Sequence, residues 1–291
     1  MLEPRDRRPL GGYGKKGATR VAITAALPMY RGRPIGWLAL ESLCAQEGID
    51  FDWELIVMEE TPEGADPMGE DAIMEYEARL QAVGCRRIIY LGIDKWVPLS
   101  TKWVRIAQVA NSDGLLLVAA DNYAPPNRLA DSHAHLTAGA HWVQCGYGLF
   151  YDIFLRSLAV YDWPRCPRAV TAICMAAPTH LVRGVTQPDA SRHVDGWLYR
   201  GVAAQVGHVR MAWSETLEWK RGLLTNGLNN ISSRRAAMMI EGRDDRRGKP
   251  SPFRPPVDGE PSSIEECLPP EVCERLLSLG GTAKRTSSFI L

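Results

Sequence analysis

The stretch that decides the fold is Ser112-Asp113-Gly114-Leu115-Leu116-Leu117-Val118-Ala119-Ala120-Asp121-Asn122-Tyr123-Ala124-Pro125-Pro126. Its apolar run, Leu115–Ala120, stops at the carboxylate of Asp121, and a proline-rich turn follows. A run of this length is too short to span a membrane and is typical of a buried parallel strand. A carboxylate at the carboxyl end of such a strand lies where open α/β sheets bind their ligands. Asp121 is therefore a candidate ligand for a divalent metal held against a diphosphate, with a helix cap as its alternative role.

Apolar runs and helical patterns alternate along the first part of the chain. Short runs typical of strands occur at Val21–Leu27, Trp53–Met58, Arg87–Leu91 and Leu115–Ala120. Helical spacing of apolar residues occurs between them, at Ile35–Gln46, Ile73–Val83 and Lys102–Ala110. This alternation predicts parallel strands joined by helical crossovers. We therefore expect an α/β fold with a mostly parallel central sheet flanked by helices.

The second half of the chain is less regular. Apolar residues recur every four positions in one segment, at Val194, Leu198, Val202 and Val206. This spacing predicts an amphipathic helix over residues 192–206. A further helix is expected over Glu215–Leu224, and short strand patterns surround these two segments.

The chain divides into three parts. Residues 1–19 form a basic N-terminal arm, 20–225 form the main domain, and 226–291 form a C-terminal extension. Within the extension, Arg243–Pro261 is rich in proline, glycine and charge, which predicts an extended linker or wrapping arm without regular structure. The pattern of Ile264–Leu279, interrupted by two prolines, predicts a final helix.

Charge and cysteine content exclude several classes of protein. The 34 basic and 34 acidic residues balance, so the composition implies no overall polyelectrolyte partner. The seven cysteines include no Cys-x-x-Cys pair, and no apolar run is long enough to span a membrane. We expect buried thiols in a reducing compartment, and hence a cytoplasmic protein. Basic residues gather in 1–33 and 234–254, where contact with nucleic acid is the less favoured alternative to simple solvation.

Five short motifs follow one another between residues 20 and 225. They are Pro28-Met29-Tyr30 after the first strand, Glu59-Glu60-Thr61 after the second, Arg105 nine residues before Gly114, Asp121 after the fourth strand, and Asp195 ahead of Arg200 and Gly207. In this order and at these distances, they resemble the inverting glycosyltransferases of the GT-A fold, of the family-2 type. The resemblance implies a nucleotide-binding half over 20–122 and an acceptor half over 123–225.

The resemblance also implies an enzyme whose donor is a nucleotide-diphosphate sugar, carried on UDP or GDP. Pro28 and Tyr30 would form a wall of the nucleobase slot. Glu59 or Glu60 would accept a hydrogen bond from a base N–H. Arg105 would add positive charge for the diphosphate, because a planar guanidinium binds phosphate oxygens at two points.

Two carboxylates would carry the chemistry of such an enzyme. Asp121 would hold a divalent cation, Mn²⁺ or Mg²⁺, which neutralises charge on the leaving diphosphate. Asp195 would be the catalytic base, taking the proton of the acceptor hydroxyl on the face opposite the leaving group, so that the sugar is transferred with inversion. The alternative role for Asp195 is that of a first-turn acid that stabilises its helix through the macrodipole.

The chain departs from the family's motifs at two places. The usual Asp-x-Asp is reduced to Asp121, with Ala119 and Tyr123 at the flanking positions, and the expected Glu-Asp pair is Val194-Asp195. A catalytically degenerate binding protein on the same scaffold is therefore an alternative, and a nucleotidyltransferase is a second one. The sequence leaves the acceptor open between a polysaccharide, a lipid-linked sugar, a protein and a modified DNA base.

Overall fold

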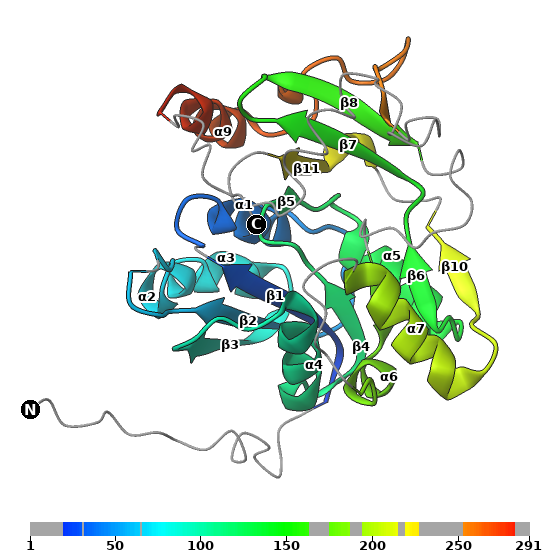
Figure 1. The fold of residues 1–291 in the computed structure, drawn as a ribbon. Helices are drawn as coiled ribbons and strands as arrows, with labels where there is room; N and C mark the ends of the chain where they lie inside the picture. The colour runs from blue at the N-terminus through cyan, green and yellow to red at the C-terminus, as the bar shows by residue number, and fades with distance from the viewer. Residues whose placement is uncertain are drawn as a thin grey trace, which may run out of the picture.

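Two β-sheets form the framework of the protein (Figure 1). The computed structural model describes residues 20–30, 32–64, 66–162, 175–186, 194–214, 219–226 and 253–282. Within these residues, a seven-stranded sheet has the strand order β10-β6-β9-β4-β1-β2-β3, and a five-stranded sheet has the order β12-β8-β7-β11-β5.

The seven-stranded sheet is mostly parallel. Its strands are β1 (Val21–Tyr30), β2 (Trp53–Glu60), β3 (Cys85–Ile93), β4 (Ser112–Leu117), β6 (Trp142–Gln144), β9 (Ala176–Pro178) and β10 (Met211–Trp213). The strand β1 pairs in parallel with β2 on one side and with β4 on the other, and β2 pairs in parallel with β3. The strand β9 runs antiparallel to β4 and β6. The predicted central sheet, mostly parallel and with helices in the crossovers, is confirmed.

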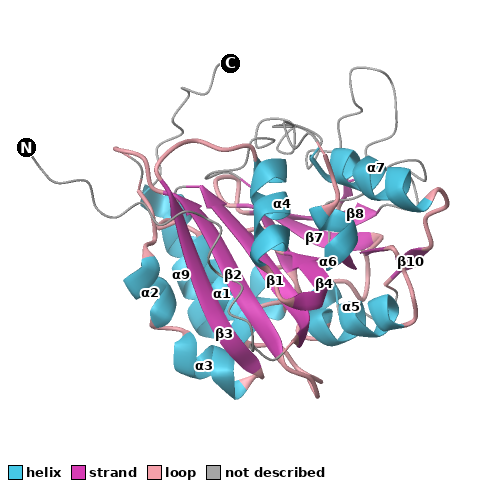
Figure 2. Ribbon diagram, turned by 90° about the horizontal axis from the view of Figure 1, so that it is seen from below, coloured by secondary structure: helices cyan, strands magenta, loops and turns pink. Residues whose placement is uncertain are grey.

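Helices cover both faces of this sheet (Figure 2). One face carries α1 (Gly36–Cys44), α2 (Glu70–Met74), α3 (Glu77–Ala82) and α5 (Arg128–Thr137), and the other carries α4 (Leu99–Val109), α6 (Thr179–Arg183) and α7 (Val194–Val206). Side chains of β1 alternate between the two cores, since Ala25 packs with the α1 side and Ala26 with the α4 side. Burial on both faces explains why the parallel strands read as continuous apolar runs. No helix in the described ranges is long and apolar enough to cross a membrane.

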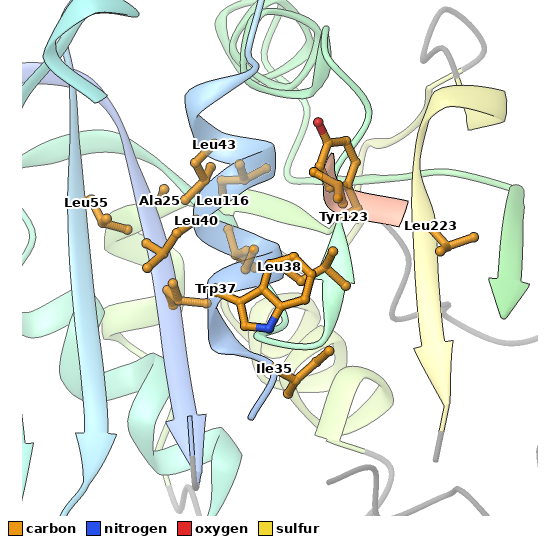
Figure 3. Packing of buried hydrophobic residues seen from close by; sticks show 14 of the residues in the cluster. Ala25, Ile35, Trp37, Leu38, Leu40, Leu43, Leu55, Leu116, Tyr123 and Leu223 are labelled. Atoms are coloured by element: carbon orange, nitrogen blue, oxygen red, sulfur yellow. The ribbon is translucent and has the colours of Figure 1, made fainter. Parts of the chain in front are cut away.

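The five-stranded sheet packs on the far side of α1. Its strands are β5 (Asn122–Tyr123), β7 (Tyr147–Asp152), β8 (Ser157–Asp162), β11 (Leu223–Asn226) and β12 (Phe253–Arg254). Figure 3 shows Trp37 and Leu38 of α1 lying between Leu55 of β2 and the pair Tyr123 and Leu223 of this second sheet. All five side chains are buried, so α1 is an interior helix held between two sheets.

The first strand is longer than its sequence suggests, because it continues through Pro28 to Tyr30. Pairing between β1 and β4 ends at Ala26 and Leu117. Pro28 therefore has a ladder partner only in β2, opposite Met58. A proline is tolerated where one side of a strand is unpaired, since its missing N–H removes no ladder bond there.

Two other expectations about secondary structure were wrong, one in the end of a strand and one in the type of element. The fourth strand was expected to reach Ala120 but ends at Leu117, because the chain turns out of the first sheet to form β5 in the second. The helix expected over Glu215–Leu224 is instead a 3-10 helix, η2 (Trp219–Arg221), followed by β11; residues 215–218 lie outside the described ranges. Pairing of Leu223 and Leu224 with β5 overrides the local helical spacing.

The C-terminal extension packs on the same core as α1. A 3-10 helix, η3 (Ile264–Glu266), precedes α9 (Pro270–Thr282), whose first residue is a proline, a position where the missing N–H is harmless. The guanidinium of Arg275 lies 4.1 Å from the centre of the Trp37 ring. Within the predicted linker, residues 253–254 form the edge strand β12, whereas residues 243–252, like the basic arm 1–19, lie outside the described residues.

Candidate functional site

The carboxyl ends of β1 and β2 carry four of the residues predicted for a nucleobase slot. The register places Pro28 beside Met58 and Tyr30 beside Glu60, so these side chains belong to one edge of the sheet. Pro28 is buried, whereas Tyr30 keeps 38% of its surface exposed. The edge therefore offers an accessible aromatic ring directly beside a buried carboxylate.

Glu59 holds two loops together from inside the protein. Its Oε1 accepts hydrogen bonds from the backbone N–H groups of Gly32 (3.2 Å) and Met68 (2.7 Å). Its Oε2 accepts from the backbone N–H of Gly69 (2.9 Å) and the hydroxyl of Tyr90 (3.0 Å). A carboxylate has about four acceptor positions, so all of them are used within the protein. Gly32 is required here, because a Cβ at that position would lie 2.4 Å from Oε1 of Glu59.

Glu60 forms a buried ion pair with Lys102 of α4. The Nζ of Lys102 lies 2.7 Å from Oε1 of Glu60 and also donates to the carbonyl oxygen of Met29 at 2.8 Å. The same Oε1 accepts from the backbone N–H of Val97 at 2.9 Å. Burial lowers the pKa of Lys102, and the neighbouring Glu60 carboxylate opposes that shift. The other oxygen, Oε2 of Glu60, is buried without a hydrogen-bond partner among the described residues.

Lys102 is a site residue that the sequence reasoning missed. It lies on the inward face of α4, together with Trp103 and Ile106. The available signal was the position of Lys102 four residues before Ile106, within an otherwise apolar stripe. A lysine at such a position enters the core only when it has a partner, and the nearby strand-end acids could have supplied one.

Arg105 lies on the same helix, one turn beyond Thr101, and is half-buried. Among the described residues, its guanidinium has no hydrogen bond or ion pair. The described residues therefore leave the donors of Arg105 unused, and neither Glu60 nor Asp121 forms a hydrogen bond or ion pair with it.

Asp121 lies in the turn between β4 and β5 and is half-buried. Its backbone carbonyl accepts hydrogen bonds from the N–H (3.2 Å) and the hydroxyl (2.5 Å) of Thr225 in β11. Burial raises the pKa of the Asp121 carboxyl to about 6, so the group is still mostly ionised at pH 7. The turn thus joins the two sheets and presents a carboxylate that has lost part of its hydration.

A divalent cation at Asp121 would need several oxygen ligands. Among the described residues, no group of three or more His, Cys, Asp or Glu side chains is placed to hold a metal ion. The described part of the protein would therefore supply at most two such side chains, Asp121 among them. That is compatible with Mg²⁺ or Mn²⁺ only in a site shared with phosphate oxygens and water, an arrangement that Mg²⁺ commonly adopts.

Asp195 lies in the first turn of α7. The helix buries Val194, Leu198 and Val202 in the core that it shares with α4 and α6. Asp195 is half-buried beside this stripe. The predicted helix is confirmed from Val194 onward, and residues 192–193 lie outside the described ranges.

Comparison with known proteins gives a likeness in fold only. No protein-family profile matches the sequence, and no functionally curated protein matches it. The structure is similar to that of TarS residues 1–349 from S. aureus in complex with UDP, with a TM-score of 0.51 and 12% identity, over 75% of this chain and 63% of that one. It is also similar to the mannosyltransferase PcManGT from Pyrobaculum calidifontis in complex with GDP-Man and Mn²⁺, with a TM-score of 0.53 and 13% identity, over 77% of this chain and 61% of that one.

These likenesses agree with the expected fold class, which is α/β and GT-A-like. The chain spans less than two thirds of the length of either protein.

Proposed function

We propose that this protein is an inverting glycosyltransferase that moves a sugar from a nucleotide-diphosphate sugar to an acceptor hydroxyl. The observation that carries the proposal is the unpartnered Oε2 of Glu60, which lies at the carboxyl edge of a GT-A-like sheet. A buried acceptor without a donor is costly, and a base N–H would satisfy it. Tyr30, exposed at the adjacent strand end, would stack on that base.

The other residues have roles that follow from their chemistry. Pro28 would form a rigid wall of the slot, and Arg105 would bind phosphate oxygens with its unused donors. Asp121 would hold a Mn²⁺ or Mg²⁺ ion which, when bound, neutralises charge on the diphosphate. Asp195 would accept the proton of the attacking acceptor hydroxyl. Glu59 is not part of this set, because its acceptor positions already fix the loops at Gly32 and Met68.

The donor classes in this proposal are UDP- and GDP-sugars. UDP is bound in the TarS structure, and GDP-Man with Mn²⁺ in the PcManGT structure. Both bases present an N–H on the edge that pairs with other bases, which suits a carboxylate acceptor.

A binding experiment tests the base slot. Calorimetry should show UDP or GDP binding in the presence of Mn²⁺, with ADP and CDP binding at least tenfold more weakly. Glu60→Gln should lose this preference, because the amide replaces one acceptor oxygen by a donor. Glu63→Gln, which alters an exposed carboxylate three residues further on, is the matched control and should bind as the natural protein does. If no nucleotide bound to the natural protein, the proposal would fail.

The incomplete Asp-x-Asp motif favours one second candidate, a nucleotide-sugar-binding protein without turnover. Release of nucleoside diphosphate from UDP-glucose, UDP-GlcNAc or GDP-mannose distinguishes the two. Slow release that requires Mn²⁺ and disappears in Asp121→Ala supports a transferase, since many transferases hydrolyse their donor when no acceptor is present. Tight donor binding with no release above the uncatalysed rate supports the binding protein.

A further inference from the structure

A small cavity of about 20 Å³ lies between the second sheet and the first residue of α5. Its lining begins at Asn122, the residue after Asp121, but includes none of the residues that the proposed function uses. Its lining comes from the β5 strand and turn, the start of β7 and the start of β11, and comprises Asn122, Tyr123, Ala124, Pro125, Arg128, Tyr147, Gly148, Leu149, Gly222, Leu223 and Leu224. The set contains one cation and no acid. The lining residues therefore carry a net positive charge.

The cation, Arg128, is buried, and no other described residue forms an ion pair with it. It is only 3% exposed. Its Nη2 donates to the carbonyl oxygens of Leu117 (2.6 Å) and Met175 (3.4 Å), and its Nε is buried without a hydrogen-bond partner among the described residues. The lining supplies no carboxylate to it, in contrast to the other buried cation in the described ranges, Lys102, which has Glu60. Burial of an uncompensated charge is strongly unfavourable, so an anion is expected beside Arg128.

One further feature favours an anion over a neutral ligand, and another limits the size of the ligand. Arg128 begins α5, a helix of 10 residues, so the positive end of the helix dipole adds to the guanidinium charge. The acid in the first turn of α5, Asp131, accepts a hydrogen bond from Ser214 and does not line the cavity. The cavity volume corresponds to roughly one water-sized particle, which limits the ligand to one atom or one oxygen of a larger group. Tyr147, which is 37% exposed, connects the lining to solvent.

We propose that this cavity binds a small anion, a halide ion or one carboxylate oxygen of a ligand, against Arg128. The bound anion would neutralise the guanidinium and stabilise the junction of β4, β5 and α5. Because the site does not include Tyr30, Glu60 or Asp195, it can exist whether or not the protein transfers sugars.

Thermal unfolding at constant ionic strength tests the site. Replacement of sodium isethionate, whose anion is too large for the cavity and carries no carboxylate, by sodium chloride or sodium formate should raise Tm saturably, by about 3 °C at ten times Kd. A rise with chloride alone identifies a halide site, and a rise with formate identifies a site for a ligand's carboxylate. No saturable rise with either salt would mean that water fills the cavity, and would overturn the proposal.

A matched pair of variants assigns the effect to Arg128. Arg128→Met should abolish the rise. Arg183→Met should retain it, because Arg183 likewise donates to two backbone carbonyls, those of Ala107 and Ala110, but is exposed and does not line the cavity. If Arg128→Met does not fold, crystals of the natural protein grown in bromide decide the question. Anomalous density beside Arg128 supports the proposal, and its absence contradicts it.

Discussion

The ammonium group of Lys102 lies 2.7 Å from Oε1 of Glu60, and both side chains are almost inaccessible to solvent. The pair joins α4 to the end of β2, and the second bond of Lys102, to the carbonyl of Met29, joins the same helix to β1. Three elements therefore meet at one buried charge pair. Removal of either charge leaves the other buried and unpaired, which costs far more than the pair itself contributes.

Replacement of Lys102 by methionine should lower the free energy of unfolding by about 3–5 kcal/mol, the usual cost of leaving a buried charge unpaired. The double variant Lys102→Met with Glu60→Met should recover most of this loss, because neither charge then remains in the core. Urea unfolding of the natural protein, both single variants and the double variant measures the coupling. Equal losses in Lys102→Met and in the double variant would show that the pair is not coupled as the structure indicates.

Glu59 should matter for stability and not for base recognition. In Glu59→Gln, one carboxylate oxygen becomes an NH₂ group that faces N–H or O–H donors, so at least one of its four hydrogen bonds is lost. We expect a loss of about 1–3 kcal/mol in the free energy of unfolding. Glu63→Gln, on an exposed residue, should lie within about 0.5 kcal/mol of the natural protein. Nucleotide specificity that changed in Glu59→Gln with unchanged stability would contradict this assignment.

The alternating first half of the fold could be predicted because its signal is local. Each strand from β1 to β4 is an apolar run, and each crossover has helical spacing, so the order of elements follows from the sequence. The second sheet could not be predicted in the same way. Strand β5 has only two residues and exists because it pairs with Leu223 and Leu224, about 100 positions later in the chain. Pairing over such a distance leaves no local pattern.

The candidate site, like the fold, could be predicted only in part. Motif order placed Tyr30 and Glu60 at one sheet edge, and the register of β1 and β2 puts them side by side. The different roles of Glu59 and Glu60 could not be predicted, because they depend on which backbone N–H groups of the loops hydrogen-bond to each carboxylate. Lys102 was overlooked because a lysine on a helix is usually solvated, and its partner lies 42 positions away.

Asp121 should make stability depend on pH. Its folded-state pKa, about 6, is above the value of 3.8 for an unperturbed group, so the folded protein binds more protons than the unfolded chain between these pH values. Stability must therefore fall as pH rises from about 4 to about 6. The full shift corresponds to roughly 3 kcal/mol, and we expect about half of it, since the side chain is only half-buried.

Asp121→Asn removes this ionisation and provides the measurement. The variant should be more stable than the natural protein by about 1–2 kcal/mol at pH 7, and this advantage should shrink towards pH 4. Asp50→Asn, on an exposed carboxylate, should show no comparable trend. Urea unfolding between pH 4 and pH 7 tests the difference, and an advantage that grew towards acid pH would have the wrong sign.

The sharpest prediction concerns Asp195, the second residue of α7. Val194, Leu198 and Val202 turn one face of the helix to the core, and Asp195 lies about 100° round the axis from Val194, at the edge of that face. A carboxylate in this position can contact a bound acceptor while it remains partly exposed to solvent. Because Asp195 is the proposed base, Asp195→Asn should lower turnover by about 10²–10⁴-fold and leave donor affinity unchanged.

The alternative, a first-turn acid that only stabilises its helix, has a matched control in this chain. Glu271 is the second residue of α9, which has 13 residues, as α7 does. Removal of either charge should cost about 0.3–1 kcal/mol through the helix dipole. Glu271→Gln should therefore lose stability like Asp195→Asn but keep full turnover of a sugar-nucleotide donor. If both variants retained turnover and differed only in Tm, Asp195 would be a helix-stabilising residue and the catalytic base would have to be sought elsewhere.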